Sequence, residues 1–269
     1  MTCFRLSGTI FALTLLGVVA LPQAARAQAS RYYIMSGDDN DRLTIVQGGA
    51  LVSTTTLAVA NQLLYPIAIR NTIWLADRGP TGGSTEVDLN GALTGNSAAY
   101  GPGFDQLLDG TTDGAFNYAV QLGGVNSVVR GNLNWTGQAA IFSVPNAENG
   151  LGITFDSVSG HLFVSSFSGK TYEMTLGGTV VNTLSVGIKA LAYEQVTDSL
   201  WGMVTTNQIR QYNKTTGATL QTLTIAGANF GNAFGGEMRL VTSAVGPEPG
   251  TLALLALGMV GGLVAKRRK

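Results

Sequence analysis

Residues 152–184 read GITFDSVSGHLFVSSFSGKTYEMTLGGTVVNTL, and residues 190–223 read ALAYEQVTDSLWGMVTTNQIRQYNKTTGATLQTL. The two stretches align, with Leu162-Phe163 opposite Leu200-Trp201. Each stretch places an apolar–aromatic pair in a β-prone run, and each later passes through a glycine turn into a further run. The alignment predicts a repeating unit of four short strands with a period of about 40 residues.

The aromatic anchor of this unit recurs along the whole middle of the chain. Its members are Tyr33, Trp74, Tyr118, Phe163 and Trp201. Turn signals follow in phase, because Gly-Gly, Asn-Gly and Thr-Gly pairs tolerate the positive φ of tight hairpins. These pairs are Gly48-Gly49, Asn90-Gly91, Gly177-Gly178 and Thr216-Gly217. A period near 40 is typical of a four-stranded propeller blade, so five anchors predict an all-β, five-bladed β-propeller over residues 31–243.

The first blade is incomplete at its start. Residues 31–57 supply only three strands, and the missing strand is expected near residues 234–241. Closure of the first blade by this C-terminal strand leaves no open sheet edge between the ends of the chain. The alternatives are a β-sandwich and a stack of repeats that does not close. The third blade, residues 104–144, is the weakest match because residues 110–114 add a further turn-like segment.

The N-terminal residues 1–27 have the three parts of a secretory signal peptide. Arg5 precedes an apolar run over about residues 10–21, Pro22 ends that run, and Ala25 and Ala27 form an A-x-A cleavage site. The alternative is an uncleaved anchor. Cleavage after Ala27 also removes Cys3, so the body has no cysteine and no disulfide.

The C-terminal residues 246–269 have a different layout. Pro247, Glu248 and Pro249 precede an uncharged apolar segment over residues 251–265. A helix of that length spans about 24 Å, less than a hydrocarbon core of about 30 Å. The chain then ends on a basic cluster, which the positive-inside rule keeps in the cytoplasm. That cluster consists of Lys266, Arg267, Arg268 and Lys269.

The order and position of these features resemble the PEP-CTERM sorting domain of exported proteins. The resemblance covers only the last residues of the chain, and it implies recognition by an exosortase of Gram-negative bacteria that make exopolysaccharide. It implies passage through the general secretion machinery, transient membrane insertion through the C-terminal transmembrane helix, and cleavage near Pro247-Glu248-Pro249. The body then reaches the cell surface or the extracellular matrix. A simple tail anchor is the alternative.

The body itself is acidic once the basic residues of both ends are removed. It has no basic run and no basic aromatic stripe, so nucleic acid is not an expected partner. Its general character is similar to secreted bacterial propellers of the NHL or quinoprotein-like kind.

Two acidic groups are candidate calcium sites. Asp38, Asp39 and Asp41 lie on a hairpin tip between the second and third strands of the first blade, where their oxygens could hold Ca²⁺. The alternative is a solvated turn rich in Asp and Asn. A second group recurs every four residues in a segment that we expect to be a loop, and could contact calcium or sugar. Its members are Asp105, Asp109 and Asp113.

Carboxylates around a central channel are the candidates for catalysis. Propeller lactonases hold a central metal with carboxylates from several blades, and the candidates here are Asp77, Asp109, Asp156, Glu194 and Glu237. Asp156 and Glu194 occupy equivalent repeat positions, which favours a structural role such as turn capping. His161 is the only histidine, and its place at the start of a strand indicates a surface position.

Tryptophan side chains are the candidates for stacking on sugars. Trp74 and Trp201 hold the repeat anchor and are expected in the blade core. Trp135 lies outside the anchor beside Asn132 and Asn134, so we expect it to be the better exposed sugar platform.

The leading hypothesis is therefore a non-enzymatic structural or binding module, without a cofactor, placed in or near the exopolysaccharide by exosortase. The alternative is an extracellular hydrolase or lactonase-like enzyme that uses channel carboxylates and Ca²⁺. A platform for protein interactions is the third hypothesis.

Overall fold

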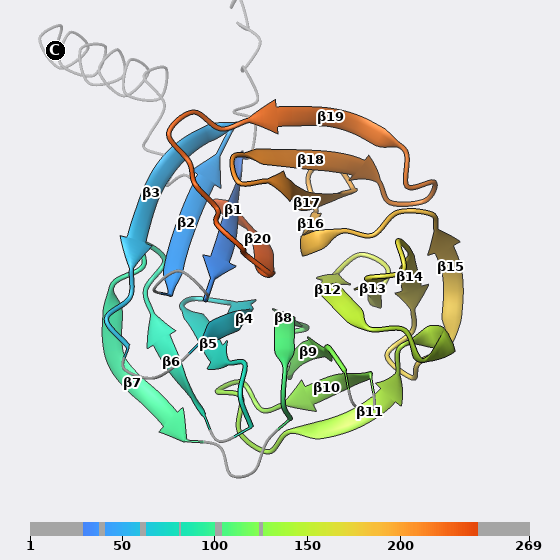
Figure 1. The fold of residues 1–269 in the computed structure, drawn as a ribbon, viewed down its shortest axis with the longest axis horizontal. Coiled ribbons are helices and arrows are strands. Elements are labelled where there is room, and N and C mark those ends of the chain that lie inside the picture. The colour runs from blue at the N-terminus through green and yellow to red at the C-terminus, as the bar shows by residue number, and fades with distance from the viewer. Residues whose placement is uncertain are drawn as a thin grey trace, which may run out of the picture.

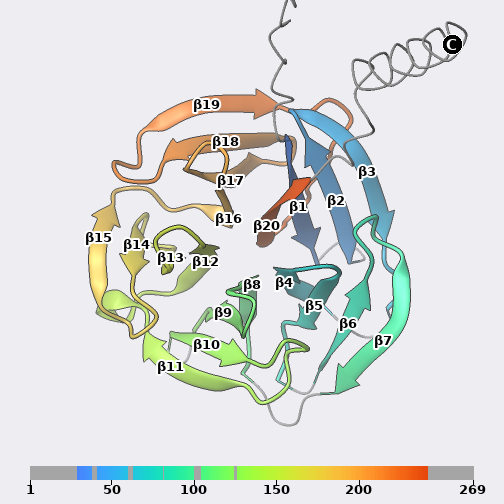
Figure 2. The ribbon, with the colours of Figure 1, turned by 180° about the vertical axis from the view of Figure 1, so that it is seen from behind.

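The computed structural model describes residues 29–37, 41–59, 63–80, 82–99, 104–123 and 126–241. The strands form five antiparallel sheets of four strands each, arranged as blades around one axis (Figures 1 and 2). The prediction of an all-β, five-bladed propeller is confirmed. The predicted signal peptide and sorting tail lie outside the described residues.

Each blade runs from an inner strand at the axis to an outer strand at the rim. Blade 1 consists of β20 (Gly235–Val241), β1 (Ala29–Ser36), β2 (Arg42–Gln47) and β3 (Ala50–Thr56). Blade 2 consists of β4 (Leu64–Ile69), β5 (Ile73–Asp77), β6 (Gly83–Val87) and β7 (Leu93–Ala99). Blade 3 consists of β8 (Leu107–Thr112), β9 (Asn117–Gln121), β10 (Ser127–Gly131) and β11 (Ala139–Ser143). Blade 4 consists of β12 (Gly150–Asp156), β13 (His161–Ser166), β14 (Thr171–Met174) and β15 (Val180–Leu184). Blade 5 consists of β16 (Lys189–Glu194), β17 (Ser199–Thr205), β18 (Gln208–Asn213) and β19 (Thr219–Thr224).

The ring is closed by the pairing of the two ends of the body. Strand β20 is antiparallel to β1, in a register that runs from Ala29 opposite Val241 to Met35 opposite Gly235. The predicted closure of the first blade is therefore confirmed. Because Ala29 and Val241 are partners, the chain enters and leaves the body at the same face, the one at which the inner strands end. We call this the upper face.

The repeat anchors explain the packing. All five anchor residues lie on the second strand of their blades, namely β1, β5, β9, β13 and β17. The predicted glycine turns join the third and fourth strands, and Gly48 and Gly49 have φ of 58° and 79°, a region that favours glycine. The apolar residues of the first three strands fill the spaces between blades; Tyr32, Trp201 and Phe230 pack together between blades 5 and 1. Burial between the first and last blades thus stabilises the closed ring.

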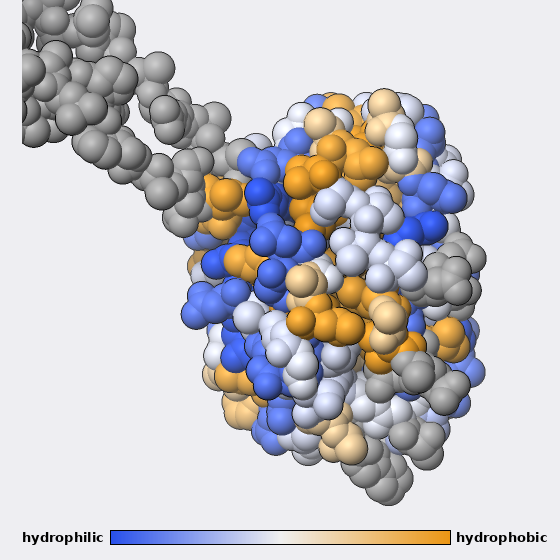
Figure 3. Space-filling view, turned by 90° about the vertical axis from the view of Figure 1, so that its left-hand side faces the viewer, coloured by the Kyte–Doolittle hydropathy of each residue, from blue (hydrophilic) through white to orange (hydrophobic). Residues whose placement is uncertain are grey.

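The outer strands make a different surface. Residues of β3, β7 and β19 are largely exposed and rich in threonine, serine and asparagine. The rim formed by β3 and β7 shows hydrophilic side chains interspersed with apolar patches (Figure 3).

One part of the third blade differs from expectation. Residues 107–112, whose second half was expected to be turn material, form the inner strand β8. A Cβ atom on Gly110 would lie 2.8 Å from the Trp135 ring and 2.9 Å from the Ile67 nitrogen. Gly110 is therefore required by the close approach of neighbouring strands rather than by a turn.

Helical structure is confined to one 3₁₀ turn, Pro145–Ala147, within the part of the chain that the structure describes. No helix in that part is both long and apolar enough to span a membrane.

Candidate functional site

The five inner strands, β20, β4, β8, β12 and β16, surround the axis (Figure 1). Side-chain hydroxyls on these strands bind backbone groups of the next blade. The Thr111 Oγ1 atom accepts the Phe155 N–H at 3.0 Å, and the Thr154 Oγ1 atom accepts the Tyr193 N–H at 3.0 Å. These bonds hold β8, β12 and β16 side by side, and both hydroxyl groups also act on the carboxyl group of Glu237 at the axis.

Asp109 lies on β8 at the centre of the axis and is fully buried. Its Oδ1 atom accepts N–H groups from Gly110 and Gly236, both at 2.8 Å. Its Oδ2 atom accepts N–H groups from Leu191 at 2.9 Å and Ile153 at 3.1 Å. Burial raises the pKa of Asp109, and the N–H donors, which bind the charged form, oppose that rise. One carboxyl group thus joins blades 3, 4, 5 and 1.

Below Asp109 the axis is filled. The rings of Tyr65 and Phe234 meet edge to face with centroids 5.3 Å apart, and the Lys189 ammonium lies 3.9 Å from the centre of the Phe234 ring. A Cβ atom on Gly236 would overlap the Ala190 carbonyl, so glycine is needed for β20 to approach β16. The lower end of the axis is therefore closed.

Glu237 lies on β20, immediately after the glycine that binds Asp109. Its side chain is buried, with 7% of the residue exposed. The only backbone group that binds its Oε1 atom is the Met238 N–H, at a long 3.3 Å, and the Oε2 atom is buried without a hydrogen-bond partner. Burial raises the pKa of Glu237 to about 8, with smaller lowering contributions from the Thr111 and Thr154 hydroxyls and the Met238 N–H.

Above Glu237 the axis opens into a cavity of about 140 Å³, which we call the axial pocket. All five inner strands contribute to its wall, with Ile69, Thr112, Phe155, Tyr193, Glu237 and Arg239 among the lining residues. Ser157 and Gln195, from the turns that follow β12 and β16, add a hydroxyl and an amide. The pocket is therefore a blind, polar end of the axis with aromatic side chains in its wall.

A second hollow runs outward from the axial pocket. It has a volume of about 620 Å³ and lies between blades 5 and 1, and we call it the interblade groove. Ser30 and Met238 line both spaces, so the groove and the pocket are neighbours. Trp201, Gln211 and Gln221 lie along the groove.

Two arginines lie side by side near the mouth of the axial pocket. Arg239 on β20 is the direct partner of Arg31 on β1. The Arg31 Nε atom donates to Gln47 Oε1 at 2.8 Å. For Arg239, no hydrogen bond or ion pair is found within the described residues. Arg239 is also one of the residues that line the axial pocket.

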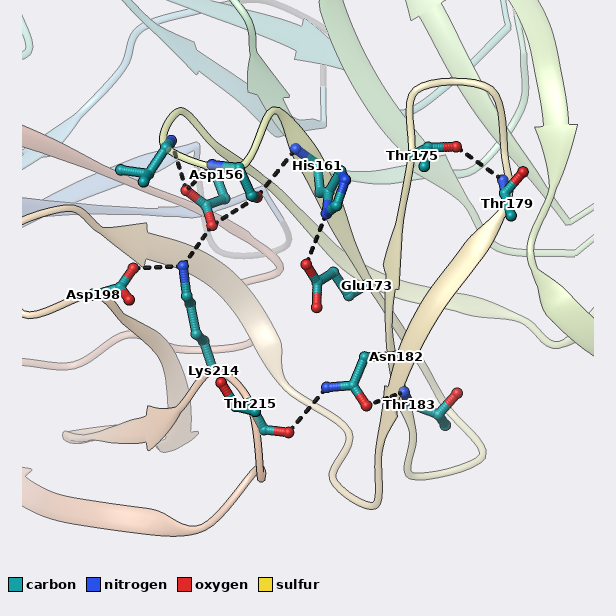
Figure 4. Close-up of polar contacts among 12 residues, drawn as sticks. Asp156, His161, Glu173, Thr175, Thr179, Asn182, Thr183, Asp198, Lys214 and Thr215 are labelled. Atoms are coloured by element: carbon teal, nitrogen blue, oxygen red, sulfur yellow. Dashed lines mark hydrogen bonds and ion pairs between the residues drawn. The ribbon is translucent and has the colours of Figure 1, made fainter.

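The other predicted channel carboxylates do not reach the axis. Asp156 caps the turn after β12 by accepting the Val158 N–H at 2.8 Å, and Lys214 of blade 5 lies 2.8 Å from its Oδ2 atom (Figure 4). Lys214 also lies 2.5 Å from Asp198. Burial opposes ionisation of Asp156, but Lys214 and the turn donors outweigh it and lower its pKa.

Glu194 and Asp77 also have local roles. Glu194 Oε2 accepts the Trp201 Nε1–H at 2.8 Å and the Thr197 hydroxyl at 2.5 Å. Asp77 Oδ1 accepts the Gly79 N–H at 3.0 Å on the lower side of blade 2. Of the five candidates, the structure brings together only Asp109 and Glu237.

His161 begins β13, as expected for a surface repeat position. Its Nδ1 atom lies 2.7 Å from Glu173 Oε1, and a quarter of the histidine side chain is exposed (Figure 4). The pair joins neighbouring strands of blade 4 and lies apart from the axial pocket.

The acidic residues of the two candidate calcium sites are described only in part. Asp38 and Asp39 lie outside the described residues. Asp41 is buried and accepts the Leu64 N–H at 2.8 Å, and burial raises its pKa to about 6. Asp113 accepts the Phe116 N–H at 2.7 Å and so caps its own turn, which is a different role from that of Asp109. Within the described ranges, no group of three or more His, Cys, Asp or Glu residues is placed to hold a metal ion.

The expectation that Trp135 is an exposed sugar platform is wrong. Trp135 is fully buried, and its Nε1–H donates to the Trp74 carbonyl at 3.2 Å. The loop between β10 and β11 folds over blade 2, where Ser84 donates to the Asn134 carbonyl at 2.6 Å. The polar neighbours of Trp135 in sequence therefore hold the loop in place while the ring fills the core.

Sequence reasoning included Asp109 and Glu237 as candidates but did not distinguish their roles, and it did not identify Arg239. The distinction depends on which backbone N–H groups meet at the axis. The apolar pair Leu107-Leu108 before Asp109 is a signal that could have identified a buried strand.

Residues 247–269 match the PEP-CTERM protein-sorting motif. The chain therefore carries the sorting signal of an exported protein that exosortase recognises and processes. The match does not include the propeller body. No curated protein matches the chain.

Two solved structures are similar to the body. A protein of unknown function from Bacteroides caccae is 11% identical, with 72% of this chain and 73% of that chain covered and a TM-score of 0.44. The glutaminyl cyclase of Myxococcus xanthus is 12% identical, with 62% of this chain and 72% of that chain covered and a TM-score of 0.46. At these values the likenesses carry no argument about function.

Proposed function

We propose that the propeller is a non-catalytic binding module that associates with exopolysaccharide at the cell surface or in the extracellular matrix. The general secretion machinery exports the chain, the C-terminal helix holds it in the inner membrane, and exosortase cleaves near Pro247-Glu248-Pro249. The proposal includes no cofactor and no nucleic acid.

The axial pocket is the observation that carries this proposal. Its wall combines hydroxyl groups, an amide, a carboxyl group and aromatic rings, a mixture suited to a hydroxyl-rich ligand. Its closed lower end and its walls from all five blades make it a preformed cavity rather than a surface irregularity.

The position of the pocket also supports a role after sorting. The body begins and ends at the paired residues Ala29 and Val241 on the upper face, where the pocket opens. The pocket therefore opens on the face at which the described part of the body ends, six residues before Pro247 in the sequence.

The test is to follow processing and polysaccharide association in the native host. Wild type and a Pro247→Ala/Pro249→Ala variant, each with an internal tag, are compared by mass and by fractionation. We expect wild type to lose its tail and to co-fractionate with exopolysaccharide, and the variant to remain full length in the membrane. Surface protein that sediments apart from the polysaccharide would overturn the proposal.

A hydrolase or lactonase-like activity is the second candidate, and Glu237 is the observation that favours it. A buried carboxyl group with a pKa of about 8 is a form suited to general acid catalysis. Turnover of lactones or glycosides that is lost in Glu237→Gln, together with a melting temperature raised by Ca²⁺, would favour this candidate over the binding module.

A further inference from the structure

We propose that the axial pocket binds the terminal residue of an acidic polysaccharide chain, with the carboxylate of a uronic-acid-type sugar at Arg239 and a sugar hydroxyl at Glu237. The rest of the chain leaves through the interblade groove. This inference rests on the proposed association with exopolysaccharide and adds the site, the sugar class and the direction of the chain.

The carboxyl group of Glu237 points to a polar ligand. Its Oε2 atom is buried without a partner, and an unpartnered buried polar atom costs free energy that a ligand can recover. Thr111 and Thr154 accept backbone N–H groups, and their hydroxyl groups lie next to the Glu237 carboxyl group, on which they act as donors. A sugar hydroxyl both donates and accepts, so it fits a carboxyl group surrounded by hydroxyls.

The arginines indicate that this sugar is anionic. Arg239 lines the pocket without an ion pair to the described residues, and Arg31 is its cross-strand neighbour. Two adjacent guanidinium groups repel each other, and a carboxylate between them relieves that repulsion. The carboxylates near this mouth are already engaged, because Asp156 and Asp198 both bind Lys214 and Asp113 caps its own turn.

The shape of the site indicates binding at a chain end. Asp109 and the aromatic contact of Tyr65 with Phe234 close the axis below Glu237, so a polymer cannot pass through. The open direction is the interblade groove, whose larger volume accommodates further sugar residues. Leu223 and the Gln221 side chain lie along it, whereas Trp201 and Gln211 are buried in its wall.

The test uses the exported protein recovered from its native host and the host's own exopolysaccharide, partially depolymerised. Binding is measured by calorimetry before and after chemical reduction of the sugar carboxylates to alcohols. We expect reduction to weaken binding by roughly tenfold or more, the loss expected for a charge-assisted contact. We also expect the number of bound proteins to follow the number of chain ends rather than the mass of polymer.

Variants assign the effect to the pocket. Arg239→Gln should weaken binding of the native oligosaccharide roughly tenfold and remove the difference between native and reduced forms. Glu237→Gln should weaken both forms alike. Arg130→Gln removes an arginine of blade 3 whose guanidinium stacks on Phe116, and it should leave binding unchanged. Thermal melting of each variant confirms that the fold is intact.

The outcomes separate this inference from the proposed function. Binding that is insensitive to carboxylate reduction and to Arg239→Gln would overturn the axial site while the polysaccharide association stands. Absence of polysaccharide binding by folded wild type would overturn both. Selective loss in Arg239→Gln alone among the two arginine variants would support the inference.

Discussion

Asp109 and Glu237 are buried carboxyl groups in consecutive layers of the same axis, and they are satisfied very differently. Asp109 accepts four backbone N–H groups from four blades. Glu237 accepts a single backbone N–H, at 3.3 Å, and its Oε2 atom has no hydrogen-bond partner. The first carboxyl group lies where the axis is closed, and the second lies at the floor of an open pocket.

The two carboxyl groups show two uses of a buried acid. A carboxylate whose lone pairs are all occupied by backbone donors stabilises the strands that carry those donors. A buried carboxyl group with an unpartnered oxygen destabilises the ligand-free protein, because burial without a hydrogen-bond partner costs free energy. The closed part of the axis thus serves the fold, and the open part is available to a ligand.

Removal of the satisfied carboxyl group should have the largest effect. Asp109→Ala leaves three N–H groups from neighbouring blades without an acceptor, and we expect a loss of about 3–5 kcal/mol in the free energy of unfolding. Thermal and urea unfolding measure this loss. Asp105→Ala, in the exposed segment before β8, is the matched control and should change stability by less than about 0.5 kcal/mol. Equal effects of the two substitutions would contradict the role of Asp109.

Substitution of Glu237 should instead raise the stability of the protein, and the size of this gain should depend on pH. The pKa of Glu237 is raised to about 8 in the folded protein, so between its ordinary value and pH 8 the folded state holds a proton that the unfolded state has lost. The stability of wild type therefore falls as pH rises through this window. Glu237→Gln lacks this loss, so the variant should gain stability relative to wild type between pH 5 and pH 8, by roughly 2–4 kcal/mol at the upper end.

Melting temperatures of both proteins across that pH range measure the gain. Asp41 and Asp109 also titrate with raised pKa values, but both are present in the two proteins and cancel in the difference. A difference that stays constant from pH 5 to pH 8 would show that Glu237 is ionised throughout and that the axial pocket satisfies it.

Asp156 extends the comparison to a buried carboxylate with a charged partner. Lys214→Met removes the ammonium that joins Asp156 of blade 4 to blade 5, and we expect a loss of about 1–3 kcal/mol at neutral pH. The pKa of Asp156 is lowered in the folded protein, so its contribution should be lost as the pH falls through that lowered pKa. Lys170→Met breaks a more exposed pair with Glu148 and is the control; a larger loss there would contradict the argument from burial.

The smallest effect is expected for a polar contact near the surface. His161→Gln removes the contact between His161 and Glu173, which are both partly exposed, and should cost less than about 0.5 kcal/mol. It should also leave polysaccharide binding unchanged, because His161 lies outside the axial pocket. Loss of binding in this variant, measured in the same calorimetric assay, would move the site to blade 4.

The blades were predictable because they repeat. An aromatic residue on each second strand and a glycine turn before most fourth strands leave a local pattern, and the missing first strand predicts its own replacement at the C-terminal end. The sorting motif was predictable for a similar reason, since its parts are contiguous and lie at the end of the chain.

The axis was predictable only in part, because its chemistry arises where five distant strands meet. Asp109 was placed in a loop because glycine and threonine follow it, whereas Gly110 is small to admit the Trp135 ring. Trp135 was expected on the surface because its neighbours are polar, but those neighbours fix the loop that buries it. In both cases the partner of the residue lies in another blade, which a local pattern does not contain.

The most direct test of the axial site is a crystal structure of the exported protein with an acidic oligosaccharide from the host's exopolysaccharide. We predict one terminal sugar in the axial pocket, with its carboxylate at Arg239, a hydroxyl at the Glu237 carboxyl group, and the chain in the groove between blades 5 and 1. An oligosaccharide bound elsewhere on the propeller, with the axial pocket filled only by water, would contradict the account.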